Sequence, residues 1–188
     1  MSKLSKEQIQ ELSMNILKDS KRRTVYYNSM EKEGYMLTES DRKWVLFYHM
    51  RFVLAILAPM ILNNFYPKLI LLWIGLGLLF YLLIGYLFKT LFQNKKVPLK
   101  VTERDLNQLY QPEVLKNHRT LERYYSSLAG ILLVYVITLV LPETMEFPLL
   151  MQIASIGLVA LVFVWRLMIL SSVSNQYKIA TQKFKDKK

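Results

Sequence analysis

A few ionisable residues lie within or beside long apolar stretches, and these are the first candidates for chemistry in this sequence. They are His49, Arg51, His118 and Arg166. A charge inside a membrane is costly and usually functional, so each needs an explanation. Arg51 can lie at the inner edge of a short membrane span, or it can face inward and bind an anionic headgroup or a partner carboxylate. Arg166 is expected to be a snorkelling anchor, which buries its stem and keeps its charge in water.

The two histidines and the residue types that are missing argue against catalysis. We expect His49 to be a hydrogen-bonded anchor at the membrane interface, with proton handling as the alternative, and His118 to be a packing residue. Two histidines on separate helices, without acidic residues at ligand spacing and without any Cys, predict no metal site. The chain contains no nucleophile elbow, zinc-protease motif, phosphate loop or dinucleotide fingerprint. The sequence therefore predicts a protein that is not an enzyme, with no catalytic residue and no cofactor.

Weakly polar side chains recur at helical spacing near the last apolar stretch. Gln152 and Ser155 share a stripe with Arg166. Such residues allow helices to approach closely and to form interhelical hydrogen bonds, so core packing explains them, and a narrow polar path is the alternative. Together with the four ionisable residues, Gln152 and Ser155 are the candidate contacts to lipid or to a protein partner.

Four stretches without any ionised side chain predict the architecture. They are residues 52–67, 69–88, 124–142 and 147–165. A bilayer core of about 30 Å needs about 20 apolar residues, and the first stretch reaches that length by including residues 44–51. The predicted fold class is all-α: a polytopic membrane protein with four transmembrane helices, arranged as two hairpins, and with amphipathic cytoplasmic helices.

The same pattern divides the chain into five predicted segments. These are a cytoplasmic N-terminal helical segment (1–43), transmembrane hairpin 1 (44–89), a cytoplasmic helical loop (90–123), transmembrane hairpin 2 (124–171) and a basic cytoplasmic tail (172–188). Residues 4–17 are expected to form an amphipathic helix. Thr38 and Thr102 are each followed three residues later by Asp, which predicts two helix N-caps. Pro112 predicts the start of a second short helix in the loop. Both halves place a cytoplasmic helix before a hairpin, a hint of internal duplication.

The positive residues predict the orientation, because Lys and Arg concentrate in cytoplasmic connections. Residues 1–44 contain nine of them, residues 89–123 eight and residues 172–188 five, whereas the two hairpin tips contain only Lys68. We therefore expect both termini and the central loop in the cytoplasm, and the tips at residues 63–67 and 142–146 outside. The chain has no Asn-x-Ser/Thr glycosylation acceptor, which favours a bacterial plasma membrane.

The net charge of +11 could also indicate nucleic-acid binding, but the basic residues flank the spans and no nucleic-acid motif accompanies them. The expected partners are anionic lipid headgroups, and a membrane protein or a second copy of the chain.

The expected function is that of a non-enzymatic integral membrane protein acting through protein–protein contacts. It would be an accessory or regulatory subunit of a membrane complex, or a membrane immunity or protection protein. The alternatives are a small transporter or channel that works as a homo-oligomer, and a lipid-modifying enzyme that uses His49, Arg51 and His118.

Overall fold

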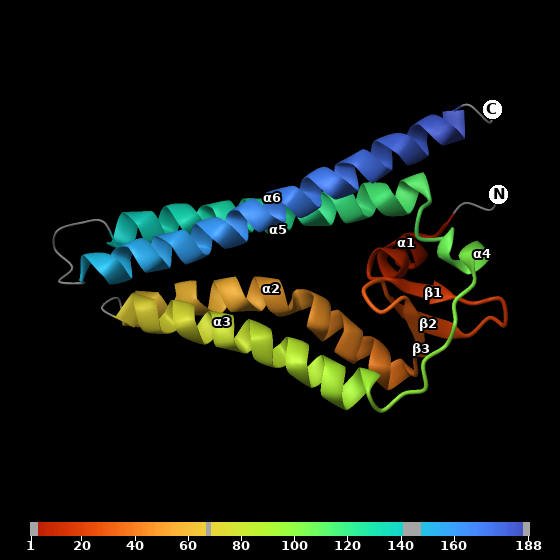
Figure 1. Ribbon diagram of the computed structural model, residues 1–188, viewed down its shortest axis with the longest axis horizontal. Helices are drawn as coiled ribbons and strands as arrows, with labels where there is room; N and C mark the ends of the chain where they lie inside the picture. Colours follow the sequence, from red (N-terminus) through yellow and green to blue (C-terminus); the bar gives the residue numbers. More distant parts are fainter. Residues whose placement is uncertain (1–3, 67–68, 141–147, 186–188) are drawn as a thin grey trace. The chain divides into compact units, whose positions relative to one another are not determined.

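The fold was analysed in a computed structural model, which describes residues 4–66, 69–140 and 148–185 (Figure 1). It is mostly helical. The helices are α1 (Lys6–Ser13), α2 (Glu39–Phe65), α3 (Ile70–Leu87), the π-helix η2 (Phe88–Gln93), α4 (Glu103–Leu106), α5 (Pro112–Val140) and α6 (Leu149–Lys185), and the strands are β1 (Ile16–Lys18), β2 (Thr24–Asn28) and β3 (Glu33–Met36). The helices α2, α3 with η2, α5 and α6 are long and apolar enough to cross a membrane.

The chain forms two compact units, which are described separately below. Unit 1 consists of Met1–His49, Ile84–Thr120 and Val173–Lys188. Unit 2 consists of Met50–Leu83 and Leu121–Ser172. Unit 1 thus collects three segments that are far apart in the sequence.

Unit 1 contains an antiparallel three-stranded sheet in the order β1-β2-β3, so the all-α prediction is wrong for this part of the chain. The predicted helix over residues 4–17 ends at Ser13, and its last residues form β1 instead. Asn15 ends the helical path because it adopts a left-handed φ of 60°, which Asn tolerates better than most residues. The β-branched and aromatic residues of β2, Thr24–Asn28, then favour an extended strand.

Both faces of this sheet are covered, because alternate residues of a strand point to opposite faces. On one face Tyr26 pairs with Ile16 and Tyr35, and these residues pack against Val45 of α2 and Phe92 of η2. The opposite face forms a second core, whose fully or largely buried members are Leu12, Leu17, Val25 and Val114. The small sheet is therefore the centre of unit 1.

The two predicted N-caps are confirmed. The hydroxyl of Thr38 donates to the Asp41 carboxylate over 2.6 Å and accepts from the Asp41 backbone N–H at the start of α2. Thr102 makes the same pair of contacts with Asp105 at the start of α4. Such contacts satisfy N–H groups that have no partner inside the helix. Pro112 begins α5, as predicted.

Two helices are longer than expected. α5 continues without a break from Pro112 to Val140, so the predicted short loop helix and the third apolar stretch are one helix. α6 extends to Lys185 and includes most of the predicted tail. Neither Gly nor Pro occurs between residues 113 and 129 or between 171 and 185, so nothing in the backbone ends these helices earlier.

Unit 2 is built from parts of the four long helices. Its buried residues form two clusters, one around Val136, Val140 and Val159, and the other around Phe52, Ile56 and Ala129. Pro59 lies within α2 and does not end it. Of the predicted hairpin tips, Pro67 and residues 142–146 lie outside the described residues, as does Lys68.

Candidate functional site

A buried ion pair joins α5 and α6 in unit 2. Nη1 of Arg166 lies 3.2 Å from Oε2 of Glu122, and the two side chains are only 9% and 7% exposed. One turn after Glu122, the hydroxyl of Ser126 donates to the backbone carbonyl oxygen of Arg166 over 3.4 Å. Removing one member of such a pair leaves an uncompensated buried charge, so the two residues depend on each other.

Three aromatic rings surround the guanidinium of Arg166. Its central carbon lies 3.8 Å from the ring centre of Phe52, 5.0 Å from that of Tyr125 and 5.1 Å from that of Trp165. Cations are attracted to the faces of such rings, and most strongly where water is excluded. The prediction of a snorkelling anchor at Arg166 is therefore wrong: a carboxylate and aromatic faces take the place of water around it. The buried Nε of Arg166 makes no hydrogen bond within the part of the chain that the structure describes.

Glu122 was missed by the sequence analysis, although a signal for it exists. Glu122 precedes the charge-free stretch 124–142, and Arg166 directly follows the stretch 147–165. If two stretches run antiparallel, the charges that border them at these ends become neighbours. Opposite charges in those positions can therefore indicate a pair.

Arg51 contacts a neighbouring helix in unit 2. Its central guanidinium carbon lies 4.6 Å from the ring centre of Tyr81 on α3, and its Nη2 donates to the Tyr81 hydroxyl over 3.4 Å. Arg51 itself is half-buried. The ring of Tyr81 meets that of Phe52 edge-on, with 6.5 Å between the ring centres. Arg51 and Arg166 thus lie against the same group of aromatic rings.

A cavity of about 110 Å³ lies among the four helices of unit 2 beside these rings. Its lining is almost entirely hydrocarbon and includes Phe52, Tyr81 and Trp165 at one end and Pro59 at the other. Gly77 also lines the cavity. A Cβ at that position would lie 2.5 Å from the carbonyl oxygen of Ala55, so only glycine allows α3 to approach α2 this closely.

A second polar contact in unit 2 involves Asn63, which was expected in the first hairpin tip. Asn63 belongs to α2 instead, is buried, and donates from Nδ2 to the Tyr135 hydroxyl of α5 over 2.8 Å. Asn63 is therefore part of a helix and not of the connection between two helices. Because α2 extends to Phe65, its last turn can place an amide against α5.

The remaining predicted residues do not converge on one site. The buried hydroxyl of Ser155 donates to the backbone carbonyl of Gln152 over 3.0 Å, a contact within its own helix. His49 belongs to unit 1, where its ring meets those of Tyr26 and Tyr48 edge-on, and His118 is half-buried on α5 in the same unit. Among the described residues, no three His, Cys, Asp or Glu side chains are placed to hold a metal ion.

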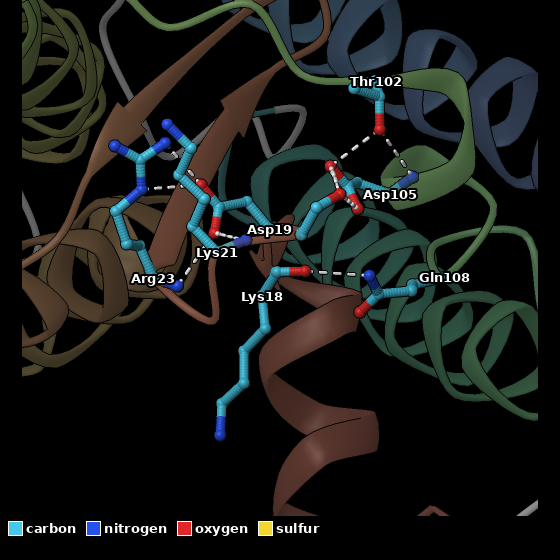
Figure 2. A network of polar contacts seen from close by, with 8 residues as sticks. Lys18, Asp19, Lys21, Arg23, Thr102, Asp105 and Gln108 are labelled. Carbon is cyan, nitrogen blue, oxygen red and sulfur yellow. Dashed lines mark hydrogen bonds and ion pairs between the residues drawn. The ribbon is translucent and has the colours of Figure 1, made fainter.

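Unit 1 contains a polar network that fastens α4 to the sheet (Figure 2). The hydroxyl of Ser20, in the β1–β2 turn, donates to both carboxylate oxygens of Asp105, over 2.8 and 3.1 Å. Thr102 donates to the same carboxylate over 2.8 Å. The side chain of Gln108 donates to the backbone carbonyl of Lys18 over 2.8 Å. Burial alone would raise the pKa of Asp105, but the hydrogen bonds from Thr102 and Ser20 hold this pKa below its ordinary value.

The β1–β2 turn beside this network is organised by Asp19 (Figure 2). Its carboxylate accepts from the backbone N–H groups of Lys21 and Arg23, each over 2.9 Å, and pairs with the Arg23 guanidinium. Burial would raise the pKa of Asp19, but the hydrogen bonds from Arg23 and Lys21 outweigh it, so the pKa is lowered. The turn therefore has a fixed shape that presents Ser20 to Asp105.

Further contacts join the N-terminal segment of unit 1 to the central segment and to the starts of α2 and α5. Gly34 and Leu99 exchange two backbone hydrogen bonds of 2.8 Å. The side chain of Asn117 donates to the Ser13 hydroxyl over 2.8 Å. Three ion pairs add to these contacts: Lys96 with Asp41 over 2.5 Å, Lys89 with Glu31 over 3.3 Å, and Arg42 with Glu11. Unit 1 is thus held together by contacts between distant parts of the sequence as well as by its cores.

No family model matches the chain, and it shows no significant similarity to a curated protein or to a solved structure. Two features of the molecule itself therefore bear on function. One is the compact unit 1, and the other is the apolar cavity of unit 2 with the arginines beside it.

Proposed function

We propose that the chain is a multi-pass membrane protein that acts by binding another protein through unit 1. Its four long helices span the membrane as two hairpins, and both termini lie in the cytoplasm. Its role is that of an accessory or regulatory subunit of a membrane complex, or of a membrane immunity or protection protein. The observation that carries this proposal is the composition of unit 1, which combines the N-terminal, central and C-terminal segments.

That composition supports a topology with all three segments on one side. Residues that exchange backbone hydrogen bonds, such as Gly34 and Leu99, cannot lie on opposite sides of a bilayer. The first and second spans must then form a hairpin between the N-terminal and central segments, and the third and fourth spans a second hairpin. The concentration of Lys and Arg in these segments favours the cytoplasmic side.

A binding role is supported by how the polar groups of unit 1 are used. The carboxylates of Asp19, Asp41 and Asp105 are occupied by caps, turns and ion pairs within the unit. A catalytic acid or base needs a group that is positioned toward a substrate. Unit 1 uses these groups to hold its shape, which suits a recognition surface.

An exposed apolar pair offers a place for a partner to bind. Near the antiparallel bridge between Gly34 and Leu99, the side chains of Met36 and Val97 are 48% and 80% exposed. Lys96 donates to the Met36 carbonyl over 2.8 Å, which fixes the backbone beneath the pair. Contiguous exposed apolar surface can mark a binding site.

Purification of the native protein in mild detergent, followed by identification of stoichiometric partners, tests this proposal. We expect Val97→Glu to weaken retention of the partner by about tenfold or more, because a charge replaces an apolar contact. Val97→Thr, which keeps the size of the side chain, is the matched control and should retain the partner. Because Val97 is largely exposed, neither substitution should unfold unit 1. A protein that purifies alone, or a partner held equally by both variants, would contradict binding at this surface.

The cavity of unit 2 favours a second candidate, a homo-oligomeric carrier of apolar cargo. Its hydrocarbon lining does not suit an ion or a polar solute. A stable homodimer without any other stoichiometric partner in the same purification would favour this candidate.

A further inference from the structure

The guanidinium of Arg119 is oriented by an aromatic ring within unit 1. Arg119 lies on α5 and Tyr177 on α6, and the central guanidinium carbon is 5.4 Å from the ring centre of Tyr177. Arginine stacks readily on an aromatic face, and this contact restrains a long side chain that could otherwise rotate. Arg119 is also half-buried, so its surroundings limit it further.

The polar atoms of Arg119 have no partner within the described part of the chain. Its Nε is buried and makes no hydrogen bond there. The two terminal nitrogens also make no hydrogen bond or ion pair with the described residues, but they are not buried and reach solvent. Two such nitrogens form a planar fork that matches the two oxygens of a carboxylate. Arg119 thus presents an oriented fork to solvent.

The described acidic residues of the chain do not neutralise this fork. Glu122, three residues further along α5, pairs with Arg166. Glu113 is exposed and precedes Arg119 by six residues, which places it about 120° away around the helix. Four other carboxylates of unit 1 already form ion pairs with other bases; they belong to Glu11, Asp19, Glu31 and Asp41. The carboxylate that suits Arg119 must therefore come from another molecule.

Two exposed lysines extend the positive charge around Arg119. Lys116 precedes it by three residues, a spacing that makes the two side chains neighbours on the surface of α5. Lys178 directly follows Tyr177 on α6. Neither lysine forms an ion pair with a described residue. A positive surface of this kind attracts an acidic partner and repels a basic one.

The position of this surface favours a protein carboxylate over a lipid headgroup. In the membrane placement proposed above, the third span begins near Tyr124, and Arg119 lies five residues before it, about 7 Å along α5. Helical side chains lean toward the N-terminus of their helix, which here is away from the membrane. Tyr177 lies 12 residues beyond Trp165, about 18 Å along α6. The headgroup layer is only about 5–8 Å thick on each side, so the guanidinium lies beyond it.

We propose that Arg119, Lys116 and Lys178 bind an acidic segment of the partner protein, with one carboxylate of that segment bound by the fork of Arg119. This inference rests on the proposed function, because it assigns a chemistry to the partner that unit 1 binds. Tyr177 orients the arginine before the partner arrives, so binding costs less ordering of this side chain. The two lysines attract the neighbouring acidic residues of the same segment.

A short acidic peptide tests this site without the natural partner. The full-length protein is placed in phosphatidylcholine nanodiscs, and binding of rhodamine-labelled tetraglutamate is measured by fluorescence anisotropy, with tetraglutamine as the neutral control. We expect only tetraglutamate to bind. Arg119→Gln should weaken its binding by about tenfold, because hydrogen bonds to a charged group are lost. Arg104→Gln, which removes an exposed arginine of unit 1, is the matched control and should weaken it by less than about twofold.

Further variants test the orientation of the fork. Arg119→Lys keeps the charge without the planar fork, so it should also weaken binding of tetraglutamate. Tyr177→Phe keeps the ring and should bind like the wild type, whereas Tyr177→Leu removes the ring and should weaken binding by about threefold. If Tyr177→Leu does not give monodisperse protein, the comparison of the Arg119 variants with Arg104→Gln still decides the proposal.

Several results would overturn the proposal. Equal affinity for the two peptides, or the same weakening in Arg104→Gln as in Arg119→Gln, would show that only diffuse charge attracts the acidic peptide. Displacement of tetraglutamate by glycerophosphoglycerol, the soluble headgroup of phosphatidylglycerol, at lower concentrations than by acetate would assign the site to lipid headgroups.

The failure of this inference can be told apart from failure of the proposed function. A native partner that Arg119→Gln retains as strongly as the wild type would contradict the acidic-segment site alone. A protein that purifies without any partner, but still binds tetraglutamate through Arg119, would contradict the proposed function and support the site for an acidic ligand.

Discussion

The ion pair between Arg166 and Glu122 is the residue-scale feature with the largest expected energetic consequence. Two buried charges lose their hydration, and their mutual attraction recovers that loss only when the geometry is good. Here the three aromatic rings and the Ser126 hydroxyl complete the surroundings of the pair. Such a pair adds little net stability over hydrocarbon, but it fixes which faces of α5 and α6 meet. The pair therefore matters mainly for positioning α5 against α6.

We therefore expect single substitutions of the pair to be far worse than the double one. Glu122→Ala should lower the free energy of unfolding by about 3–5 kcal/mol, because the charge of Arg166 is left buried and unpaired. Glu122→Leu combined with Arg166→Met should recover most of this loss, because no charge remains. Thermal or denaturant unfolding in detergent measures both. Glu113→Gln, at an exposed position of α5, is the control and should change stability by less than about 0.5 kcal/mol. If the stability loss of the double variant equals the sum of the losses from substituting Glu122 and Arg166 singly, the two residues do not form a pair.

The residue-scale predictions from sequence succeeded where the determinant is local and failed where it is not. The caps at Thr38 and Thr102 depend on a residue three positions away, so the sequence contains all the necessary information. The partner of Arg166 lies 44 positions away, and the burial of Asn63 depends on Tyr135 of another helix. Neither contact can be read without knowing how the helices pack. The aromatic surroundings of Arg51 were missed for the same reason.

At the scale of elements, the apolar helices were predictable and the small sheet was not. Long charge-free stretches identify α2, α3, α5 and α6 because each helix is apolar along many turns. The strands have only three to five residues, and their register is set by partners elsewhere in the chain. The turns depend on left-handed conformations at Asn15, Arg22 and Lys32. Arg and Lys seldom adopt this conformation, so the sequence does not indicate the turns at Arg22 and Lys32.

The attachment of α4 to the β1–β2 turn should depend on pH. The pKa of Asp105 is lower in the folded chain than its ordinary value of 3.8, so the unfolded state binds the proton more strongly. The stability from this carboxylate is therefore complete above that ordinary pKa and is lost as the pH falls through the lower, folded value. We expect hydrogen-exchange protection of α4, corrected for intrinsic rates, to fall below about pH 4.

Asp105→Asn is the matched variant for this prediction. It keeps the size of the side chain but removes the titrating group, so its α4 should be less protected at neutral pH and should lose little more on acidification. Any loss of α4 protection that the Asp105→Asn variant still shows at low pH comes from other carboxylates, including Asp19, whose pKa is also lowered. An unchanged acid response in the variant would show that Asp105 does not fasten α4.

At the scale of the whole molecule, the chain separates two tasks between its two units. Unit 1 has a sheet, capped helices and ion pairs that suit water, whereas unit 2 has apolar helices with a few enclosed polar contacts. The long helices α2, α3, α5 and α6 each contribute to both units. This division follows from the segregation of charge in the sequence, but the joining of three distant segments in unit 1 does not, because it depends on contacts such as Gly34 with Leu99.

The proposed topology predicts which positions an impermeant thiol reagent can reach. The chain has no Cys, so a single introduced Cys gives a signal without background. Asn64, exposed at the end of α2, lies 20 residues beyond Trp44, which is about 30 Å of helix and enough to bring it to the outer side. Asn64→Cys should therefore react in intact cells. Asn107→Cys and Met30→Cys, both exposed in unit 1, should react only after the membrane is opened. Because unit 1 is one compact body, these two must behave alike. Labelling of only one of them in intact cells would contradict the shared side on which the proposed function depends.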